Sequence, residues 1–560
     1  MSIRRWLQGW LARDEGAPAA SGFERAPEAQ QALAQRYFSE GAQHLASGRL
    51  PDAETALARA LECRHDYAEA LLLQSLVYRK QGRSTDAADS LLLAAHFNPD
   101  YAEAHFHLGV LAEEERRGGE AIASYDRAIA ANPGYAGAYN ARGAVRLRNG
   151  DLDGAVNDFR HALELKPDFH QAHANLGCTL ITRLDRFDEG APHIERAWRL
   201  APEDPDVMCN RAMLLQYRGS LSEALALYDR LIEHDAQADE ARLNRALLLL
   251  KQGEFARGWP DYEARKRIGW GYTPREFPVP EWSGEPLSGR TVLVHAEQGL
   301  GDQIMFASCI PDLARRAAHC VVESPGKLEA LFRRSFPSTT VIETGAVAAG
   351  KPWPGGVPRA DCHVAIGSLP RRFRNALADF PAHDGYLEAD PGKVAAWRRR
   401  LAGLPGARKI GISWRGGMKS SRQSMRSVPL ERWLPIFGQP DVAFVSLQYT
   451  ECRAELGELE RIHRVRVHHW QEAIDDYDET AALVCALDLV LSVQTSIVHL
   501  GGALGRPVWV MVPAVAEWRY LQSGERMPWY PSVRVWRRHE AGDWDTVIGS
   551  VARALAAPAP

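Results

Sequence analysis

The sequence of 560 residues has few cysteines, little net charge and no long apolar run. Its 8 cysteines are scattered without a C-x-x-C pair, so neither a zinc site nor a disulfide framework is indicated. The formal net charge of −4 gives no reason to expect binding to nucleic acid or to a membrane surface. No apolar run approaches the length that spans a bilayer, so we expect no transmembrane segment. The cysteine usage suits a reducing compartment, and we expect a cytoplasmic protein.

Length and composition predict a soluble protein of several domains. The chain exceeds what one hydrophobic core usually holds, which indicates roughly two to four domains. Hydrophobic content of 46% and charged content of 25% are typical of soluble globular proteins. Residues 1–33 form a predicted tail, in which Trp6, Leu7, Trp10 and Leu11 have helical spacing. These side chains could dock on a partner or a membrane surface; the alternatives are packing on the protein's own first helices and disorder.

The first half of the chain repeats with a period of 34 residues. Small residues recur at this spacing and prolines close the units, as expected where two antiparallel helices approach closely and the second then ends. The first small-residue column is Gly41, Ser75, Gly109, Gly143 and Gly177, continued after one inserted residue by Ala212 and Ala246, and the prolines are Pro99, Pro133, Pro167 and Pro202. The pattern resembles the tetratricopeptide repeat over residues 34–268. That resemblance implies a helical solenoid that binds a peptide or a protein.

Three asparagines recur within this array. Asn175, Asn210 and Asn244 each stand two residues before the small-residue column in successive repeats, so we expect them along one face. A carboxamide offers a donor and an acceptor, which suits pairing with the backbone of an extended peptide. The nucleocytoplasmic O-linked N-acetylglucosamine transferases have a similar ladder of asparagines. The alternative is that each asparagine bonds only within its repeat.

The second half predicts two α/β lobes after a linker at residues 269–289, which is rich in proline, glycine and tryptophan. From Thr291 the sequence indicates a strand, a glycine turn and a helix. Gly299 and Gly301 leave room for a ligand close to the backbone. Asp302 stands at the expected N-cap, where capping explains a carboxylate, but also near the end of a strand, where α/β sheets bind ligands. G-x-G-D is not a dinucleotide fingerprint, and no Walker lysine is present.

We place the first lobe at residues 290–388 and the second at 389–556, with a hinge near 383–393. The second lobe opens with a strand that ends at Trp414, and a later strand ends near Gln448, where a base or ribose could bind. A basic, glycine-containing loop follows Trp414. Its positively charged side chains could neutralise a diphosphate. The alternative is that they are ordinary surface charges in contact with solvent. The loop residues are Arg415, Gly416, Gly417, Lys419, Arg422 and Arg426.

Residues 488–513 predict a strand, a tight turn, a helix and a second strand. The turn is Gln494, Thr495 and Ser496, and either hydroxyl can cap the helix. The backbone N–H groups at such a helix start, together with the helix dipole, bind phosphate. His499 lies about one turn further and could add a donor. An ordinary capped helix with a satisfied histidine is the alternative.

Four motifs in this order resemble GT-B glycosyltransferases, especially the lipopolysaccharide heptosyltransferase family: AEQGLGDQI, ISWRGG, FVSLQ and SVQTSIVHLGGALGRPVWVMVP. They occur in that form in bacterial proteins with an N-terminal tetratricopeptide array, and flagellin-modifying glycosyltransferases share this layout. The resemblance implies an α-helical solenoid followed by an α/β GT-B fold of two Rossmann-like lobes. A nucleotide sugar would bind between the lobes, with no metal or other cofactor.

The resemblance also implies roles for individual residues. Asp302 would be the general base that deprotonates an acceptor hydroxyl, with inversion at the anomeric carbon. Heptosyltransferases have aspartate-threonine where this chain has Gln494 and Thr495, which leaves the donor open and favours a different donor over an inactive site. The implied donor-binding residues are Gly299, Gly301, Trp414, Arg415, Gln448, Gln494, Thr495, Ser496 and His499, and the acceptor-binding residues are Asn175, Asn210 and Asn244.

We therefore predict a cytoplasmic glycosyltransferase that moves a sugar from a nucleotide sugar to a serine or threonine hydroxyl of a protein. Flagellin is the leading acceptor by resemblance, bound through the groove of the repeat array. One alternative is transfer to a lipopolysaccharide or polysaccharide precursor. Another is a repeat scaffold whose GT-B-like domain has no catalytic role.

Overall fold

The computed structural model describes residues 28–184, 186–235, 237–417, 426–539 and 544–557. Most of the predicted tail, with Trp6 and Trp10, lies outside these residues, as do Lys419 and Arg422 of the basic loop. The chain divides into two compact units, one up to residue 207 and one from residue 208. We describe each unit by itself.

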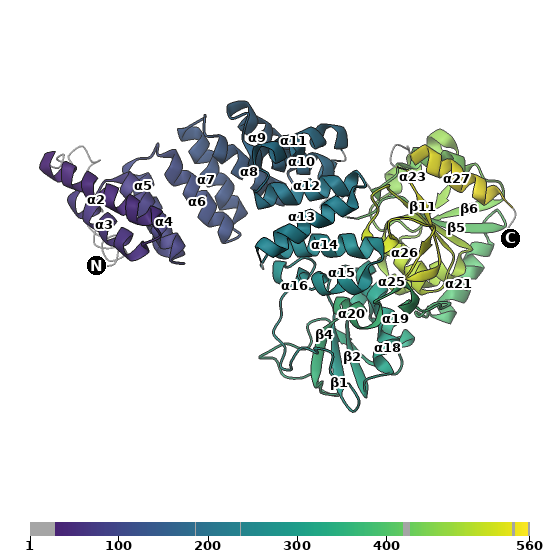
Figure 1. Ribbon diagram of the computed structural model, residues 1–560. Helices are drawn as coiled ribbons and strands as arrows, with labels where there is room; N and C mark the ends of the chain where they lie inside the picture. Colours follow the sequence, from purple (N-terminus) through teal and green to yellow (C-terminus); the bar gives the residue numbers. More distant parts are fainter. Residues whose placement is uncertain (1–27, 185, 236, 418–425, 540–543, 558–560) are drawn as a thin grey trace, which may run out of the picture. The chain divides into compact units, whose positions relative to one another are not determined.

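The first unit is a succession of antiparallel helix pairs, as the repeat period predicts (Figure 1). The small-residue column lies where the two helices of a pair touch. A Cβ atom on Gly109 would lie 2.5 Å from the Tyr125 ring, and one on Gly143 would lie 2.7 Å from the Phe159 ring. The helices are α2 (Glu28–Ala46), α3 (Leu50–Cys63), α4 (Ala68–Lys80), α5 (Ser84–Phe97), α6 (Ala102–Glu114), α7 (Gly118–Ala131), α8 (Ala136–Arg148), α9 (Leu152–Leu165), α10 (His170–Leu184) and α11 (Phe187–Leu200).

The second unit begins with the last repeats, although we expected the whole array to end as a separate domain before a linker. Their helices share one hydrophobic core with the α/β part: Trp259 and Tyr262 belong to the same buried cluster as Ile304 and Tyr530. The reason is that aromatic side chains of the last helix pair pack against the α/β part. The helices are α12 (Pro205–Tyr217), which crosses the division, α13 (Leu221–His234), α14 (Asp239–Gln252), α15 (Phe255–Tyr262) and α16 (Arg265–Ile268).

The first sheet of the second unit has four parallel strands in the order β3-β2-β1-β4. Its strand order reverses between β1 and β4, and open α/β sheets bind ligands beside the carboxyl ends of the strands at such a point. The strands are β1 (Thr291–His295), β2 (His319–Ser324), β3 (Thr340–Glu343) and β4 (Cys362–Ala365). The accompanying helices are α17 (Leu300–Ala307), α18 (Ile310–Ala314), α19 (Gly326–Ser335), η1 (Ile366–Ser368), α20 (Pro370–Phe373) and η2 (Leu377–Asp379).

The second sheet has seven strands in the order β10-β11-β9-β8-β5-β6-β7, and only the β10 pairing is antiparallel. Its parallel strands, taken in chain order, follow the doubly wound arrangement 3-2-1-4-5-6. The order reverses between β5 and β8. The strands are β5 (Arg408–Ser413), β6 (Val442–Ser446), β7 (Val467–His468), β8 (Leu489–Val493), β9 (Val508–Val512), β10 (Arg526–Met527) and β11 (Tyr530–Arg537).

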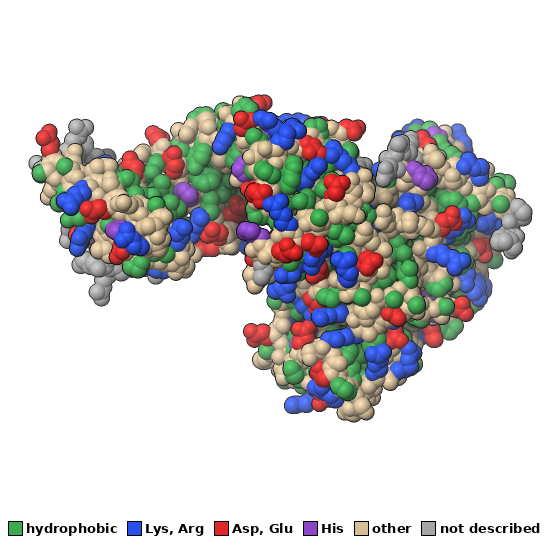
Figure 2. Space-filling model, in the orientation of Figure 1, with side chains coloured by type: hydrophobic (Ala, Val, Ile, Leu, Met, Phe, Trp, Pro, Cys, Tyr) green, Lys and Arg blue, Asp and Glu red, His purple; other side chains and the backbone are tan. Residues whose placement is uncertain are grey.

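The helices of the second sheet cover its two faces and carry the turns discussed below (Figure 1). They are α21 (Pro391–Ala402), η5 (Leu430–Trp433), α22 (Leu434–Phe437), α23 (Arg453–His463), α24 (Gln471–Asp475), α25 (Tyr477–Ala486), α26 (Ser496–Ala503), η6 (Trp518–Tyr520) and α27 (Trp544–Ala556). The predicted order, a helical array followed by α/β structure with two sheets, is therefore confirmed. The face drawn in Figure 2 mixes basic with acidic side chains, in keeping with the small net charge.

The segment predicted as an interlobe hinge is bonded to both lobes. The backbone N–H groups of Tyr386 and Leu387 donate to the Ala503 carbonyl of α26, at 2.8 and 3.0 Å. The Tyr386 hydroxyl donates to the Ile304 carbonyl of α17 at 2.7 Å. The crossing segment therefore fixes α17 and α26 against each other.

Candidate functional site

The turns that follow β1 and β8 meet in the structure, although they belong to different sheets. A Cβ atom on Gly301 would lie 3.0 Å from the His499 ring and 3.4 Å from the Ser496 Cα. We expected Gly301 to leave room for a ligand; instead, its missing side chain lets α26 approach α17. The predicted glycine turn at 299–301 and the predicted phosphate-binding turn at 494–496 are thus neighbours.

Asp302 lies in the first turn of α17 and forms an ion pair with Arg519. The N-cap of α17 is Gly299, with φ −82° and ψ 166°, so our placement of Asp302 at the cap was wrong. The Arg519 Nε donates to Asp302 Oδ1 at 2.9 Å, and its Nη2 contacts the same oxygen. Burial alone would lower the pKa of Arg519, but the charges of Asp302 and Glu517 outweigh it and raise that pKa. Arg519 therefore keeps its positive charge despite its burial.

A chain of alternating charges continues from this pair. Glu517 lies 3.5 Å from Arg519 Nη1 and 3.7 Å from Arg426 Nη1. It connects the Asp302 turn with the residue that ends the basic loop. Sequence reasoning missed the role of Arg519, because its partner Asp302 is 217 positions away and no local pattern connects them.

The turn after β8 presents a buried amide and a helix start. Gln494 is 4% exposed, and among the described residues its Nε2 has no hydrogen-bond acceptor. Thr495 is the N-cap of α26, but its hydroxyl lies 3.0 Å from the Ser492 hydroxyl and makes no capping bond. No side chain therefore caps this helix start within the described part of the chain, contrary to our expectation for Thr495 or Ser496.

His499 is a neutral side chain in this structure. It is 6% exposed, and its Nδ1 lies 3.1 Å from the Tyr530 hydroxyl. Burial, with a smaller contribution from the positive charge of Arg519, lowers the pKa of His499 to about 3. At neutral pH this imidazole can exchange hydrogen bonds but adds no positive charge to the site.

Gln448 organises the start of the basic loop. Its Oε1 accepts from the backbone N–H groups of Trp414 and Arg415, at 3.2 and 3.0 Å. Its Nε2 donates to the Arg415 carbonyl and the Thr450 hydroxyl, at 3.1 and 3.0 Å. We expected Gln448 to read a base or ribose; the structure shows a fully buried amide that holds the loop backbone.

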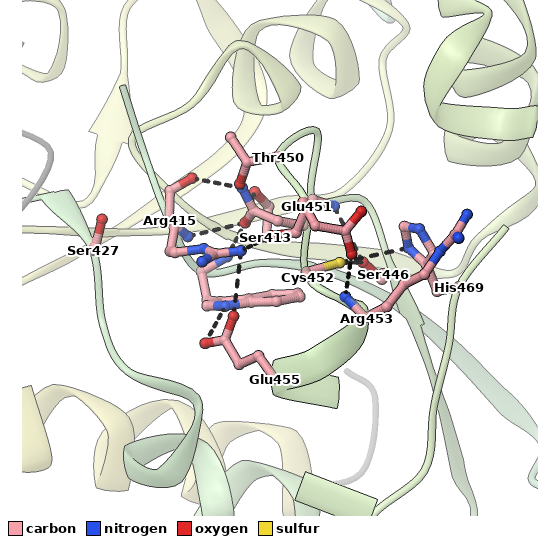
Figure 3. Close-up of polar contacts among 12 residues, drawn as sticks. Ser413, Arg415, Ser427, Ser446, Thr450, Glu451, Cys452, Arg453, Glu455 and His469 are labelled. Carbon is pink, nitrogen blue, oxygen red and sulfur yellow. Dashed lines mark hydrogen bonds and ion pairs between the residues drawn. The ribbon is translucent and has the colours of Figure 1, made fainter. Parts of the chain in front are cut away.

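Trp414 and Arg415 differ in their access to a ligand. Trp414 is fully buried in the second core cluster and donates from Nε1 to Glu455 at 2.9 Å, so its side chain does not face a binding surface as we expected. The Arg415 side chain is 31% exposed; its Nη2 donates to the Glu451 carbonyl at 2.6 Å and lies 3.3 Å from Glu455 (Figure 3). Arg415 thus offers a partly exposed positive charge at the start of the loop.

The loops after β5 and β8 touch at the point where the strand order reverses. A Cβ atom on Gly416 would lie 2.5 Å from the Gln494 carbonyl oxygen. Only glycine fits this contact without a shift of one backbone. The structure thereby brings the backbone that follows Arg415 next to the turn of Gln494, Thr495 and Ser496.

The asparagines of the repeat array occupy both units. In the first unit, Asn175 Nδ2 donates to Asn140 Oδ1 at 3.0 Å, which joins α10 to α8. We missed Asn140 because it stands three residues before the small-residue column rather than two. In the second unit, Asn244 Nδ2 donates to Cys209 Sγ at 3.4 Å, and Asn210 lies half-buried on α12.

The described residues contain neither a metal-binding cluster nor a helix that could span a membrane. In the described part of the chain, no group of three or more His, Cys, Asp or Glu side chains could hold a metal ion. None of the described helices combines the length and the apolarity needed to cross a membrane.

The tetratricopeptide repeat family matches residues 38–96, 92–136, 140–206 and 209–269, so this chain carries the predicted repeats. Protein FlbA of Caulobacter vibrioides (strain ATCC 19089 / CIP 103742 / CB 15) is 31% identical over 434 residues, which cover 74% of this chain and 66% of that protein. The chain thus spans just under two thirds of this relative. The match covers 74% of this chain, whereas the repeats occupy less than half of it, so the similarity extends into the α/β part.

Two solved structures are each similar to part of this chain. A crystal structure of MamA protein is 26% identical, covering 30% of this chain and 93% of that one, with a TM-score of 0.27. A tetratricopeptide repeat protein from Parabacteroides merdae ATCC 43184 is 18% identical, covering 43% of this chain and 94% of that one, with a TM-score of 0.36.

Proposed function

We propose that this protein is a glycosyltransferase of the GT-B type, which moves a sugar from a nucleotide sugar to a serine or threonine hydroxyl of a protein. One observation carries the proposal: the turns after β1 and β8, which belong to two separate sheets, meet, and each lies beside the point where its sheet reverses strand order. Such points are where open α/β sheets bind nucleotides. The sugar would lie between the turns.

The donor diphosphate fits the start of α26. The backbone N–H groups of Ser496 and Ile497 stand at an uncapped helix start, which attracts anions. Gln494 adds a buried Nε2 that has no hydrogen-bond acceptor among the described residues. A buried donor without an acceptor destabilises a protein by about 1–3 kcal/mol. A phosphate oxygen would satisfy it. Arg415 supplies a partly exposed positive charge. The neutral Gln494 amide avoids the repulsion of the diphosphate that a carboxylate at this position would cause.

Asp302 is the group placed to accept a proton. One oxygen of Asp302 accepts a bond from Arg519, and in the reaction Arg519 would turn toward the donor phosphate and leave the carboxylate to act as the base. The acceptor hydroxyl oxygen then forms a bond to the anomeric carbon and gives its proton to the Asp302 carboxylate. The bond from that carbon to the phosphate oxygen breaks, and the nucleotide leaves with both bonding electrons. The anomeric configuration inverts.

The repeat array supplies the acceptor site in this proposal. Tetratricopeptide arrays expose an extended surface to a bound polypeptide. The carboxamides of Asn140 and Asn175 form one pair on neighbouring repeats, and each retains further hydrogen-bonding capacity for a peptide backbone. Flagellin is the first acceptor to test, on the strength of the sequence resemblance alone.

Nucleotide binding tests the donor site directly. Thermal unfolding of the full chain with UDP, GDP, ADP and CMP should show stabilisation by one of them, about 2.7 kcal/mol at one hundred times its dissociation constant. Gln494→Leu removes the buried donor at similar volume. We expect it to leave the ligand-free stability unchanged or raised and to weaken the nucleotide effect at least tenfold in apparent affinity.

The matched control is Gln439→Leu, at a partly exposed position where Nε2 donates to the Pro435 carbonyl at 3.3 Å. This variant should bind the nucleotide as the wild type does. Equal nucleotide affinity in Gln494→Leu and the wild type would refute the placement of the phosphate at this turn.

One observation favours a second candidate, a repeat scaffold with a non-catalytic GT-B-like domain. Asp302 is held by Arg519, and the space beside Gly301 is filled by His499 and Ser496. A site satisfied by its own side chains would need no ligand. Absence of stabilisation by every nucleotide of the panel would support this reading.

A further inference from the structure

Two residues with strained backbones flank the Asp302–Arg519 pair. Gln298, four residues before Asp302, has a φ of +63°. Leu521, two residues after Arg519, has a φ of +58° and a ψ of 176°. Residues other than glycine rarely adopt these backbone conformations, and such strain persists only where the surrounding structure holds it.

The end of the repeat array holds Gln298. The Tyr262 hydroxyl of α15 donates to Gln298 Oε1 at 3.1 Å. The Gln298 backbone N–H donates to the Gly271 carbonyl, just after α16, at 2.8 Å. A Cβ atom on Gly271 would lie 3.0 Å from the Gln298 side chain, so this contact is close as well. One polar group of the strained residue is therefore bonded to the last repeat and another to the segment that directly follows it.

The residue before Gln298 is fixed by the same part of the chain. Arg265 of α16 is fully buried, and its guanidinium contacts both oxygens of Glu297, at 2.6 and 3.2 Å. Glu297 Oε1 also accepts from the Gly367 backbone N–H of η1 at 2.9 Å. A buried bidentate pair is sensitive to the loss of either partner. It clamps the turn between β1 and α17 onto the last repeat.

The last repeat also holds the loop that carries Arg519. The backbone N–H next to Leu521, that of Gln522, donates to the Lys251 carbonyl at the end of α14, at 2.8 Å. The Trp518 ring meets the rings of Trp259 and Tyr262 edge to face, at centroid distances of 5.6 and 5.9 Å. The Arg519 guanidinium lies 4.9 Å from the Trp518 ring centroid. The same helices therefore support both partners of the charge pair.

We propose that the last repeat helices, α14 to α16, position Asp302 and Arg519 for the reaction, with Tyr262 as the central positioning residue. The inference rests on the proposed function, because it assigns Asp302 and Arg519 to that reaction. Tyr262 continues the repeat pattern: Tyr228 stands 34 residues earlier and bonds within the array, its hydroxyl accepting from Gln216 at 2.8 Å. In the last repeat the equivalent hydroxyl faces the Asp302 turn. The end of the acceptor-binding array is thus part of the catalytic half.

Tyr262→Phe and the matched Tyr228→Phe test this role in the full chain. Each variant removes one hydroxyl from a buried tyrosine and keeps the ring. Two readouts are compared with the wild type: hydrogen exchange of residues 296–303 without ligand, and turnover of UDP-, GDP-, ADP- and CMP-sugars. Tyr262→Phe should speed exchange at least fivefold and lower kcat at least tenfold, with KM for the nucleotide sugar within twofold. Tyr228→Phe should change neither readout.

The two readouts separate failure of this inference from failure of the proposed function. Wild-type exchange and wild-type kcat in Tyr262→Phe would overturn the positioning role. If the wild type itself turns over no nucleotide sugar, the proposed function fails, and exchange alone decides: faster exchange in Tyr262→Phe supports the bracing of the turn, and unchanged exchange overturns it. Equal effects of Tyr262→Phe and Tyr228→Phe would also overturn it, because they indicate loss of array packing only.

Discussion

Replacing Asp302 by asparagine removes one charge of a largely buried ion pair. The two side chains are 20% and 11% exposed, for Asp302 and Arg519 respectively. Removing one partner of a fully buried pair costs about 3–5 kcal/mol. Here the amide oxygen can still accept a bond from Arg519, and Glu517 lies 3.5 Å from Nη1. We therefore expect Asp302→Asn to lower the free energy of unfolding by about 2–3 kcal/mol.

The same estimate gives a melting shift. A unit of this size has an unfolding entropy of about 0.7 kcal/mol per kelvin, so its Tm should fall by about 3–4 °C. A double-mutant cycle with Arg519→Gln isolates the pair. We expect a coupling free energy of about 1.5 kcal/mol or more, because each single variant leaves a charge without its partner and the double variant does not. Denaturation in urea measures all four proteins.

An exposed ion pair provides the control for this cycle. Arg333 and Glu329 of α19 are 2.7 Å apart, with side chains 55% and 36% exposed. Their coupling should be about 0.3–0.5 kcal/mol. If the coupling between Asp302 and Arg519 is no larger than this, the two side chains do not form a buried pair, and the electrostatic account of the site is refuted.

Two further predictions concern the turn around Gln494. Gly416→Ala should destabilise the protein by about 1–3 kcal/mol, because its Cβ would lie 2.5 Å from the Gln494 carbonyl oxygen. Gly457→Ala in α23, where a Cβ meets nothing within 4 Å, should instead stabilise by up to about 1 kcal/mol; similar effects in urea denaturation would contradict the contact. For His499, the pKa is about 3 in the folded protein against the ordinary 6.5, so the unfolded chain binds a proton first and stability is lost as pH falls from about 6.5 toward 3. His499→Gln lacks this group, so its stability should fall less than that of the wild type between pH 7 and pH 4; an equal fall measured by denaturation would contradict the neutral, buried imidazole.

Local patterns account for what the sequence predicted well. The repeat period is a local property, since each helix pair buries the large residue of one column, such as Tyr125, against the small residue of another, Gly109. The strand, turn and helix around Asp302 and around Ser496 are likewise short segments, whose ends are marked by glycine, proline or possible capping residues. The prediction that both turns serve one site remains a proposal, but their proximity in the structure agrees with it.

Long-range contacts account for what the sequence did not reveal. The partner of Asp302 is 217 positions away, and the partner of Gln298 lies in the repeat array, so no spacing rule finds them. The same holds for Gln448, whose side-chain amide forms hydrogen bonds with the backbone after β5 and not with a ligand as we expected. The pKa of His499 depends on burial by elements far along the chain, and the helix position alone does not predict it.

Sugar transfer to a polypeptide is the measurement that tests the central claim most directly. Purified wild-type protein and Asp302→Asn would each be incubated with purified flagellin and the UDP-, GDP-, ADP- and CMP-sugars, and the intact mass of the flagellin would be recorded. The account predicts that the wild type adds the mass of one or more sugar residues with one of these donors, and that Asp302→Asn, still folded, adds at least a hundredfold less per unit time, as expected when a general base is lost. Transfer by Asp302→Asn at the wild-type rate would contradict the catalytic role of Asp302. Modification of a saccharide acceptor without modification of any polypeptide would contradict the proposed acceptor.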